Sequence, residues 1–142
     1  MILRTLEEND LSFIYASYLK SLRPHKSSIA NDVYYPNEHK IMESLLLNAL
    51  TVVLVDNEDS NLIVGWASAT IVPELRLVLN YCYIKRRYRK LGYASKLIDT
   101  IIEHADEDLP RFCSCHTPSF IRLSSKYRLI YNPYLISLGE LP

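Results

Sequence analysis

The sequence lacks an excess of charge of either sign. Its 142 residues include 16 basic and 16 acidic side chains, which give a formal net charge of zero. A chain with this balance has no overall field to attract nucleic acid or an anionic membrane. Any affinity of that kind must come from a local cluster of charges.

The sequence also lacks long apolar runs. The longest ones, such as Leu50–Val55 and Ile98–Ile102, are far too short to span a bilayer. The first six residues do not show the basic-then-apolar order of a secretory signal. We therefore expect a cytoplasmic protein without a membrane partner.

Cysteine is scarce as well, with only Cys82, Cys113 and Cys115 in the chain. In a strand, Cys113 and Cys115 would point to the same side, too close together for an easy disulfide. A structural zinc site usually needs four ligands from two separated clusters, whereas Cys113–His116 is a single cluster. We expect reduced, buried thiols and no bound metal.

What the chain does contain is enough apolar material for a core. Hydrophobic residues make up 49% of the sequence, and no internal repeat or linker interrupts it. At this length, such a composition is typical of one compact domain. We predict a single domain over residues 1–142.

Periodicity and turn residues predict an alternating order of elements. The strongest pattern is helical and follows Gly92, whereas residues 25–36 resemble a loop. Strands are predicted at residues 2–6, 51–55, 62–72, 75–84, 111–116 and 129–138, and helices at 11–22, 41–49, 94–105 and 118–127. The parallel strand-helix-strand unit in residues 75–116 favours a mixed α/β sheet with helices on both faces.

A strand, a short basic turn, a glycine and an amphipathic helix follow one another around Gly92. The unpaired N–H groups and the dipole of a helix N-terminus point into such a turn and attract an anion. A glycine at this point lets the backbone approach a phosphate closely. The segment is therefore a candidate phosphate site.

This turn resembles the signature of the GNAT family of N-acetyltransferases, Arg/Gln-x-x-Gly-x-Gly/Ala. Arg89, Gly92 and Ala94 occupy its three defined positions, and the apolar strand ending at Ile84 precedes it at the family's spacing. The predicted element order agrees with the family over nearly the whole chain. The resemblance implies an α/β fold with a mixed, mostly antiparallel sheet of about six to seven strands and about four helices.

The resemblance also implies acetyl-CoA as cosubstrate and an unknown primary amine as acceptor, with transfer by direct attack. Pantetheine amides would pair with backbone near Cys82, Tyr83 and Ile84. The residues implied for the pyrophosphate are Arg89, Lys90, Leu91, Gly92, Tyr93, Ala94 and Ser95. One or more of Lys85, Arg86, Arg87, Lys90 and Lys96 would face the adenosine phosphate.

Direct transfer needs an acid near the departing thiolate and a base for the amine. The family often places a tyrosine acid late in the helix after the fifth strand, and Tyr127 is the best match, with Ser124 and Tyr131 as alternatives. Asn80 stands where a carboxylate base would be convenient. His116 is the candidate base, since histidine accepts protons near neutral pH, although it can equally be a strand-end histidine without a catalytic role.

Two other functions stay open at this point. One is a CoA-binding or interaction module that has lost turnover. The other is nucleic-acid binding or base modification, in which Tyr81, Tyr83 and Tyr88 would stack on bases beside the basic turn. Residues 18–23 and 131–134 also resemble short phage and prophage GNAT proteins, which would imply a host cytoplasm. The protein is expected to be a monomer or a homodimer.

Overall fold

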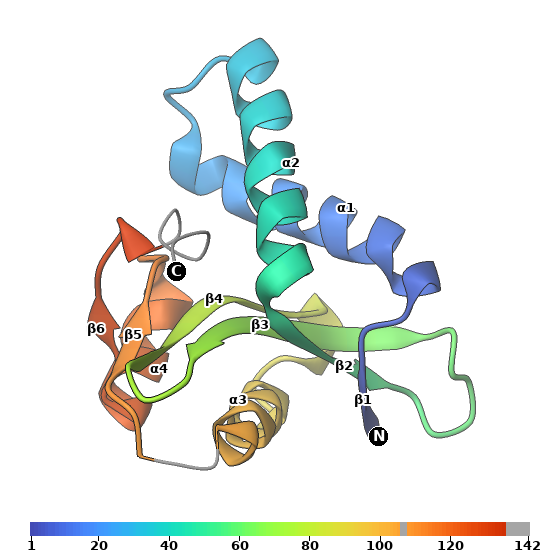
Figure 1. The fold of residues 1–142 in the computed structure, drawn as a ribbon. Coiled ribbons are helices and arrows are strands. Elements are labelled where there is room, and N and C mark those ends of the chain that lie inside the picture. Colours follow the sequence, from blue (N-terminus) through green and yellow to red (C-terminus); the bar gives the residue numbers. More distant parts are fainter. Residues whose placement is uncertain (106–107, 136–142) are drawn as a thin grey trace.

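The computed structural model of the protein describes residues 1–105 and 108–135. Within them, six strands form one sheet and four α-helices cover it (Figure 1). The strands are β1 (Ile2–Thr5), β2 (Leu50–Val55), β3 (Ile63–Val72), β4 (Arg76–Ile84), β5 (Arg111–Cys113) and β6 (Ile130–Tyr131). The helices are α1 (Leu11–Leu22), α2 (Asn31–Asn48), α3 (Tyr93–His104) and α4 (Pro118–Tyr127), with 3₁₀ turns η1 (Glu8–Asp10), η2 (Arg23–Lys26) and η3 (Arg86–Tyr88).

The sheet is mixed, as the sequence predicts. Its strands lie in the order β1-β2-β3-β4-β5-β6. The first three pairings are antiparallel, while β4–β5 and β5–β6 are parallel. Helix α3 forms the crossover between the parallel strands β4 and β5, so the expected strand-helix-strand unit is present.

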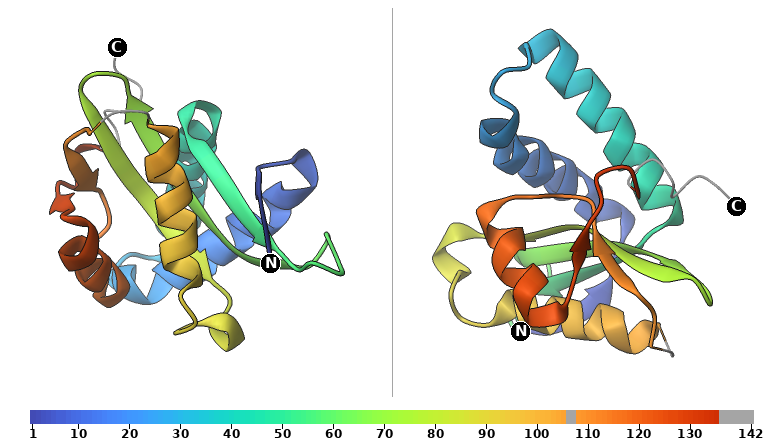
Figure 2. Two further views of the ribbon diagram at one scale, coloured as in Figure 1. Left: turned by 90° about the horizontal axis from the view of Figure 1, so that it is seen from below. Right: turned by 90° about the vertical axis from the view of Figure 1, so that its left-hand side faces the viewer.

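Helices cover both faces of the sheet. Figures 1 and 2 show α1 and α2 on one face and α3 and α4 on the other. Because both faces are covered, Val52–Val55 of β2 is buried along its whole length and forms a continuous apolar run. Leu97, Ile98 and Ile101 form the buried stripe of α3, in agreement with the predicted spacing.

Helix α1 is fixed to the centre of the sheet by a buried aromatic cluster. The Trp66 Nε1–H donates a hydrogen bond of 2.8 Å to Ser17 Oγ. The Tyr81 ring packs against Trp66 at 5.6 Å and against Tyr18 at 4.9 Å between centroids. These contacts hold the C-terminal half of α1 over β4, where the strand approaches its end.

The expectation of a loop over residues 25–36 is wrong, because η2 and the first turns of α2 occupy most of it. Arg23 organises this region: its Nη1 and Nη2 donate to the carbonyls of Lys26 and Ile29, each at 2.7 Å. Pro36 lies inside α2, near its start. A proline there removes one backbone hydrogen bond without ending the helix.

The last two strands are shorter than predicted. β5 ends at Cys113 instead of continuing to residue 116, and β6 covers only Ile130–Tyr131. A register shift opposite Ser68/Ala69 bulges β4 just past Leu79, which is the last residue that pairs with β5. A bulge bends and twists its strand, so β4 and β5 separate beyond this point. Residues 136–138 of the predicted last strand lie outside the described residues.

Asp10 joins the start of α1 to β1. Its carboxylate accepts hydrogen bonds from both terminal nitrogens of Arg4, at 2.6 and 3.0 Å, and from the Glu7 N–H at 2.8 Å. Burial by itself would raise the pKa of Asp10, but these hydrogen bonds outweigh burial and lower the pKa below its usual value. Asp10 therefore binds fewer protons in the folded than in the unfolded chain.

We expect Asp10→Asn to lower the free energy of unfolding at neutral pH by about 2 kcal/mol, because it weakens a charged, buried pair. The native carboxylate stabilises the fold above its unfolded-state pKa of about 3.9, and this stability is lost as the pH falls through the lower folded-state pKa. Urea unfolding at a series of pH values measures the difference. The difference in unfolding free energy between the wild type and Asp10→Asn should shrink in acid. A difference independent of pH would contradict a lowered pKa for Asp10.

Candidate functional site

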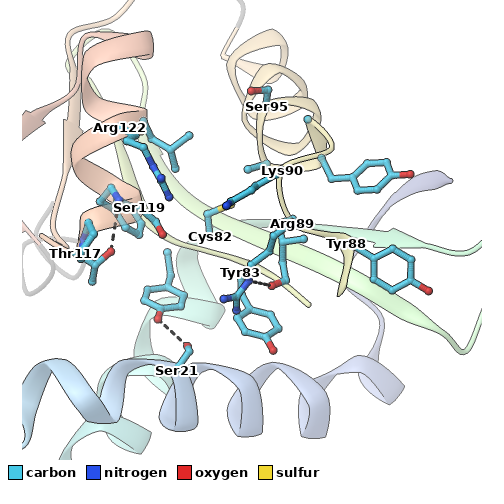
Figure 3. Close-up of a pocket in the computed structure, with 18 of the residues that line it drawn as sticks. Ser21, Cys82, Tyr83, Tyr88, Arg89, Lys90, Ser95, Thr117, Ser119 and Arg122 are labelled. Carbon is cyan, nitrogen blue, oxygen red and sulfur yellow. Dashed lines mark hydrogen bonds between the residues drawn. The ribbon is translucent and has the colours of Figure 1, made fainter. Parts of the chain in front are cut away.

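A cavity of about 640 Å³ lies where β4 separates from β5 and α4 (Figure 3). This volume is within the usual range for small-molecule sites. Its walls come from α1 and η2, the end of β4, the turn before α3, and α4. The lining residues are Ser21, His25, Tyr81, Cys82, Tyr83, Ile84, Tyr88, Arg89, Lys90, Gly92, Tyr93, Ala94, Ser95, Thr117, Pro118, Ser119, Phe120, Arg122 and Leu123.

The N-terminus of α3 opens into this cavity. Gly92 is the N-cap of the helix with φ of 86°, in the left-handed region that favours glycine. The first helical hydrogen bond runs from the Lys96 N–H to the Gly92 carbonyl, at 3.2 Å. The N–H groups of Tyr93, Ala94 and Ser95 therefore have no partner within the helix, and all three residues line the cavity.

Arg89 holds the basic turn against the end of β4. Its Nε donates to the Ile84 carbonyl at 2.8 Å, and its guanidinium lies 5.7 Å from the centroid of the Tyr83 ring. Lys90, the next residue, has φ of 65°, so two left-handed residues lie within three positions of the turn. These contacts define a compact turn that leads directly into α3.

The main chain of β4 faces the cavity on one side. The ladder between β4 and β5 covers only Leu77–Leu79 of β4. The Lys85 N–H donates to the Val64 carbonyl of the neighbouring segment. Because main-chain groups alternate in direction along a strand, those of Cys82 and Ile84 point away from β3 and toward the cavity.

The cavity walls are basic. Arg89, Lys90 and Arg122 line them, and among the described lining residues there is no aspartate or glutamate. Figure 3 shows Lys90 and Arg122 pointing into the cavity from opposite walls. Side chains of like charge on facing walls favour an anionic ligand between them.

Helix α4 forms the wall opposite the turn. Thr117 is its N-cap and accepts a hydrogen bond from the Phe120 N–H, with Pro118 in the first turn as the sequence predicts. At its C-terminal end, Lys126 Nζ donates to Ser95 Oγ at 2.7 Å. This bond joins α4 to the first turn of α3 across the edge of the site.

All but one of the ten residues predicted to bind the cofactor line the cavity. The exception is Leu91, whose side chain is 63% exposed. Its backbone still lies in the turn between Lys90 and Gly92. The structure thus brings the predicted set together, and the binding of CoA by these residues stays a prediction.

The two predicted catalytic residues lie outside the cavity lining. The Tyr127 hydroxyl is 2.9 Å from Asp99 Oδ1 and 3.2 Å from the Ser95 carbonyl, so it joins α4 to α3. Burial and the neighbouring Asp99 raise the pKa of the Tyr127 phenol. His116 is exposed, and its ring lies 4.7 Å from that of Tyr131. Their catalytic roles stay predictions.

We expect Tyr127→Phe to lower the free energy of unfolding by about 1 kcal/mol, because it removes the hydrogen bond between α4 and Asp99. Thermal or urea unfolding measures this change. A further fall of about a hundredfold in turnover at unchanged acetyl-CoA affinity would assign the acid role to Tyr127. An unchanged unfolding free energy would show that the bond is not formed in solution.

Ten of the cavity's lining residues were absent from the predicted site, among them Ser21, His25 and Tyr81. Ser21 Oγ lies 2.7 Å from the Tyr81 hydroxyl, although 60 positions separate them in the chain. Alternation along β4 indicated that Tyr81 and Tyr83 share a face, and both do pack toward α1. No local signal connects residues 21 and 25 to this strand.

The cysteines show no sign of an activated thiolate. Burial raises the pKa of Cys82 to about 12 and that of Cys115 to about 11. All three cysteines are free of disulfides. Among residues 1–105 and 108–135, no three His, Cys, Asp or Glu side chains are placed to hold a metal ion.

No helix among the described residues is both long and apolar enough to cross a membrane.

The chain matches a protein-family model described as the acetyltransferase (GNAT) family over residues 12–119. Its fold is similar to that of a transcriptional regulator from Bacillus halodurans C-125, with 18% identity, a TM-score of 0.64, and coverage of 89% of this chain and 90% of that one. A possible acetyltransferase from Clostridium difficile 630 gives 17% identity, a TM-score of 0.61 and coverage of 89% and 86%. An acetyltransferase from Vibrio fischeri shares 14% identity with a TM-score of 0.58, and the match covers 80% of this chain and 94% of that one. No curated protein is a significant sequence match.

Proposed function

Because this chain belongs to the GNAT family of acetyltransferases, we propose that it transfers the acetyl group of acetyl-CoA to a primary amine. The observation that carries the proposal is the cavity between β4 and α4, with the N-terminus of α3 and a basic wall at one end. The amine nitrogen would attack the thioester carbonyl directly. Burial raises the pKa of the Cys82 thiol, which disfavours Cys82 as an acyl carrier.

The phosphates of acetyl-CoA fit the α3 end of the cavity. The unpaired N–H groups of Tyr93, Ala94 and Ser95 would donate to a pyrophosphate, as the first turn of a helix does in other anion sites. Lys90 and Arg122 would neutralise its charge from the two sides. This arrangement supports a polyanionic ligand better than a neutral one.

The pantetheine arm fits the uncovered edge of β4. The main-chain groups of Cys82 and Ile84 face the cavity, and β5 does not pair with β4 beyond Leu79. An extended ligand with amide groups would pair with this edge as an additional strand does. The Ile84 carbonyl already accepts the Arg89 Nε–H, so Cys82 is the freer of the two residues.

The acetyl group would then lie toward α1, near the hydroxyls of Ser21 and Tyr81. These hydroxyls are 2.7 Å apart and both residues line the cavity. Burial raises the pKa of Tyr81, so its phenol stays protonated and can donate a hydrogen bond. Tyr81 lines the cavity and is therefore a candidate hydrogen-bond donor to the departing thiolate. Tyr127 does not line the cavity.

Isothermal titration of the purified full chain with acetyl-CoA tests the proposal, with Lys90→Glu/Arg122→Glu as the matched variant. We expect the wild type to bind and the double charge reversal to weaken binding more than tenfold, because two cations on facing walls become anions. Both variant positions are exposed, so the fold is expected to persist. Absence of binding by folded wild-type protein would overturn the proposal.

Two alternatives give different results in the same experiments. A CoA-binding module without turnover would bind acetyl-CoA but release no CoA when amines are added. Nucleic-acid binding would appear as salt-sensitive association with single strands. Two of the three tyrosines offer little surface for stacking on a base, because Tyr81 is only 6% exposed and Arg89 lies over the ring of Tyr83. We therefore favour transfer over nucleic-acid binding.

A further inference from the structure

The end of the cavity opposite α3 is built by α1 and η2. Ser21 lies in the last turns of α1 and His25 in η2, and both line the cavity. Figure 3 shows Ser21 and Ser95 at opposite ends of this space. If acetyl-CoA binds as in the proposed function, on which this step rests, the acceptor amine enters at the end that holds His25.

The backbone around His25 is held on both sides. Arg23 donates to the carbonyls of Lys26 and Ile29 at 2.7 Å each, which closes the turn over His25. Lys26 forms an ion pair with Glu38 of α2, whose side chain is 7% exposed. The imidazole of His25, by contrast, is exposed at the cavity. A side chain on an anchored turn can meet a ligand in a defined position.

His25 is the histidine that lines the cavity. His39 and His116 stack on tyrosine rings, and His104 bonds a backbone carbonyl of its own helix. None of the described residues forms a hydrogen bond or ion pair with the His25 ring. Among the described residues, no group therefore competes with a ligand for its ring nitrogens.

Within the described lining of the cavity, no carboxylate competes with His25 for the role of base. Among the described residues that line the cavity there is no aspartate or glutamate. Asn80, which stands on β4 beside Tyr81, is an amide and accepts no proton; its Nδ2 donates to Thr70 Oγ1 at 2.9 Å. Glu38 is close to this end but is already bound by Lys26 and by the Tyr18 hydroxyl.

We infer that His25 is the catalytic base of the transfer, and that the acceptor is an amine whose remaining part carries no second positive charge. The acceptor ammonium gives one proton to the His25 imidazole, and the neutral nitrogen forms the new N–C bond. The C–S bond breaks with its electron pair on sulfur. The second proton of the nitrogen ends on that sulfur, through the Tyr81 and Ser21 hydroxyls, so that the products are the amide, CoA thiol and imidazolium.

The restriction on the acceptor follows from the charges of the described residues that line the whole cavity. Lys90, Arg89 and Arg122 line the cavity, and Lys26 follows His25 in η2. A polyamine would bring a second ammonium into a basic cavity without a lining carboxylate to pair with it. A carboxylate or a neutral amide in the same place meets cations or hydrogen-bond donors instead.

A comparison of two nucleophiles tests the role of His25. CoA release by the full chain is followed with a thiol reagent, with β-alaninamide or hydroxylamine as the probe nucleophile. The amine is protonated at neutral pH and needs a base, whereas hydroxylamine is already largely neutral and does not. We expect His25→Gln to slow transfer to β-alaninamide by about a hundredfold and to leave the hydroxylamine reaction nearly unchanged.

His104→Gln is the matched control, since His104 is exposed on α3 outside the cavity and its loss should change neither rate. Equal loss of both reactions in His25→Gln, or of neither, overturns the base assignment. β-Alanine and β-alaninamide should exceed diaminopropane as acceptors, and the reverse order overturns the acceptor class. A wild type that binds acetyl-CoA but uses none of these nucleophiles overturns the inference, whereas absence of binding overturns the proposed function itself.

Discussion

Replacement of Gly92 by valine should weaken acetyl-CoA binding more than tenfold while the fold remains intact. Gly92 has φ of 86°, and a Cβ added there meets no atom within 4 Å. The penalty is therefore one of backbone conformation, and it is largest for a β-branched residue. We expect the chain to relieve this strain by rotating φ at residue 92, which turns the first N–H groups of α3 away from the cavity.

Gly92→Asn is the matched control for this substitution. Asparagine adopts the left-handed region far more readily than valine, so it should keep the turn and most of the affinity. Calorimetry with acetyl-CoA gives the affinities, and urea unfolding should show a loss of only about 1 to 2 kcal/mol for valine. A Gly92→Val variant that binds acetyl-CoA with wild-type affinity would show that the N–H groups of this turn do not hold the ligand.

Gly65→Ala should destabilise the protein by about 3 kcal/mol, more than the conformational penalty at Gly92. An added Cβ at Gly65 would lie 2.6 Å from the Tyr83 carbonyl oxygen and 3.3 Å from Ile84 Cα. These atoms belong to the backbone of β4, which is the direct pairing partner of Gly65 in β3. The two strands must move apart, and a well-packed core resists that movement.

The strand displacement caused by Gly65→Ala should extend to the cavity. Tyr83 and Ile84 both line the cavity, and the Ile84 carbonyl accepts the Arg89 bond that holds the basic turn. Gly92→Ala adds the same methyl group at the other described glycine, without a steric contact. Denaturant unfolding and acetyl-CoA calorimetry on Gly65→Ala and Gly92→Ala separate the steric contact from the backbone strain. Equal losses of stability would refute the steric explanation.

The element order was accessible from the sequence because it depends on local patterns. The apolar spacing of α3 survives in the structure, with Leu97 and Ile101 fully buried. Pro118, as a proline of the first helical turn, marked the start of α4 correctly. The signature at Arg89, Gly92 and Ala94 worked for the same reason: a turn and the helix that follows it are determined by neighbouring residues.

The errors occurred where side-chain hydrogen bonds or strand geometry override the preference of the local composition. Residues 25–36 directly follow Pro24, end at Pro36 and contain many polar groups, so they resemble a loop. The Arg23 guanidinium nevertheless donates hydrogen bonds to the carbonyls of Lys26 and Ile29, and these bonds stabilise η2 and the start of α2. Residues 114–116 have the composition of a strand, but the bulged β4 does not continue beside them.

By itself, the sequence determined the turn at Arg89–Ala94, the helix that follows it and the family to which the chain belongs, because each depends on residues adjacent in the chain. Only the tertiary structure decided which residues line the end of the cavity opposite α3. It brings Ser21 and His25 of the α1–η2 segment to Tyr81 of β4, and it directs Tyr127 to α3 instead. Those positions depend on how helices pack across a sheet whose strands separate, and no local pattern carries that information.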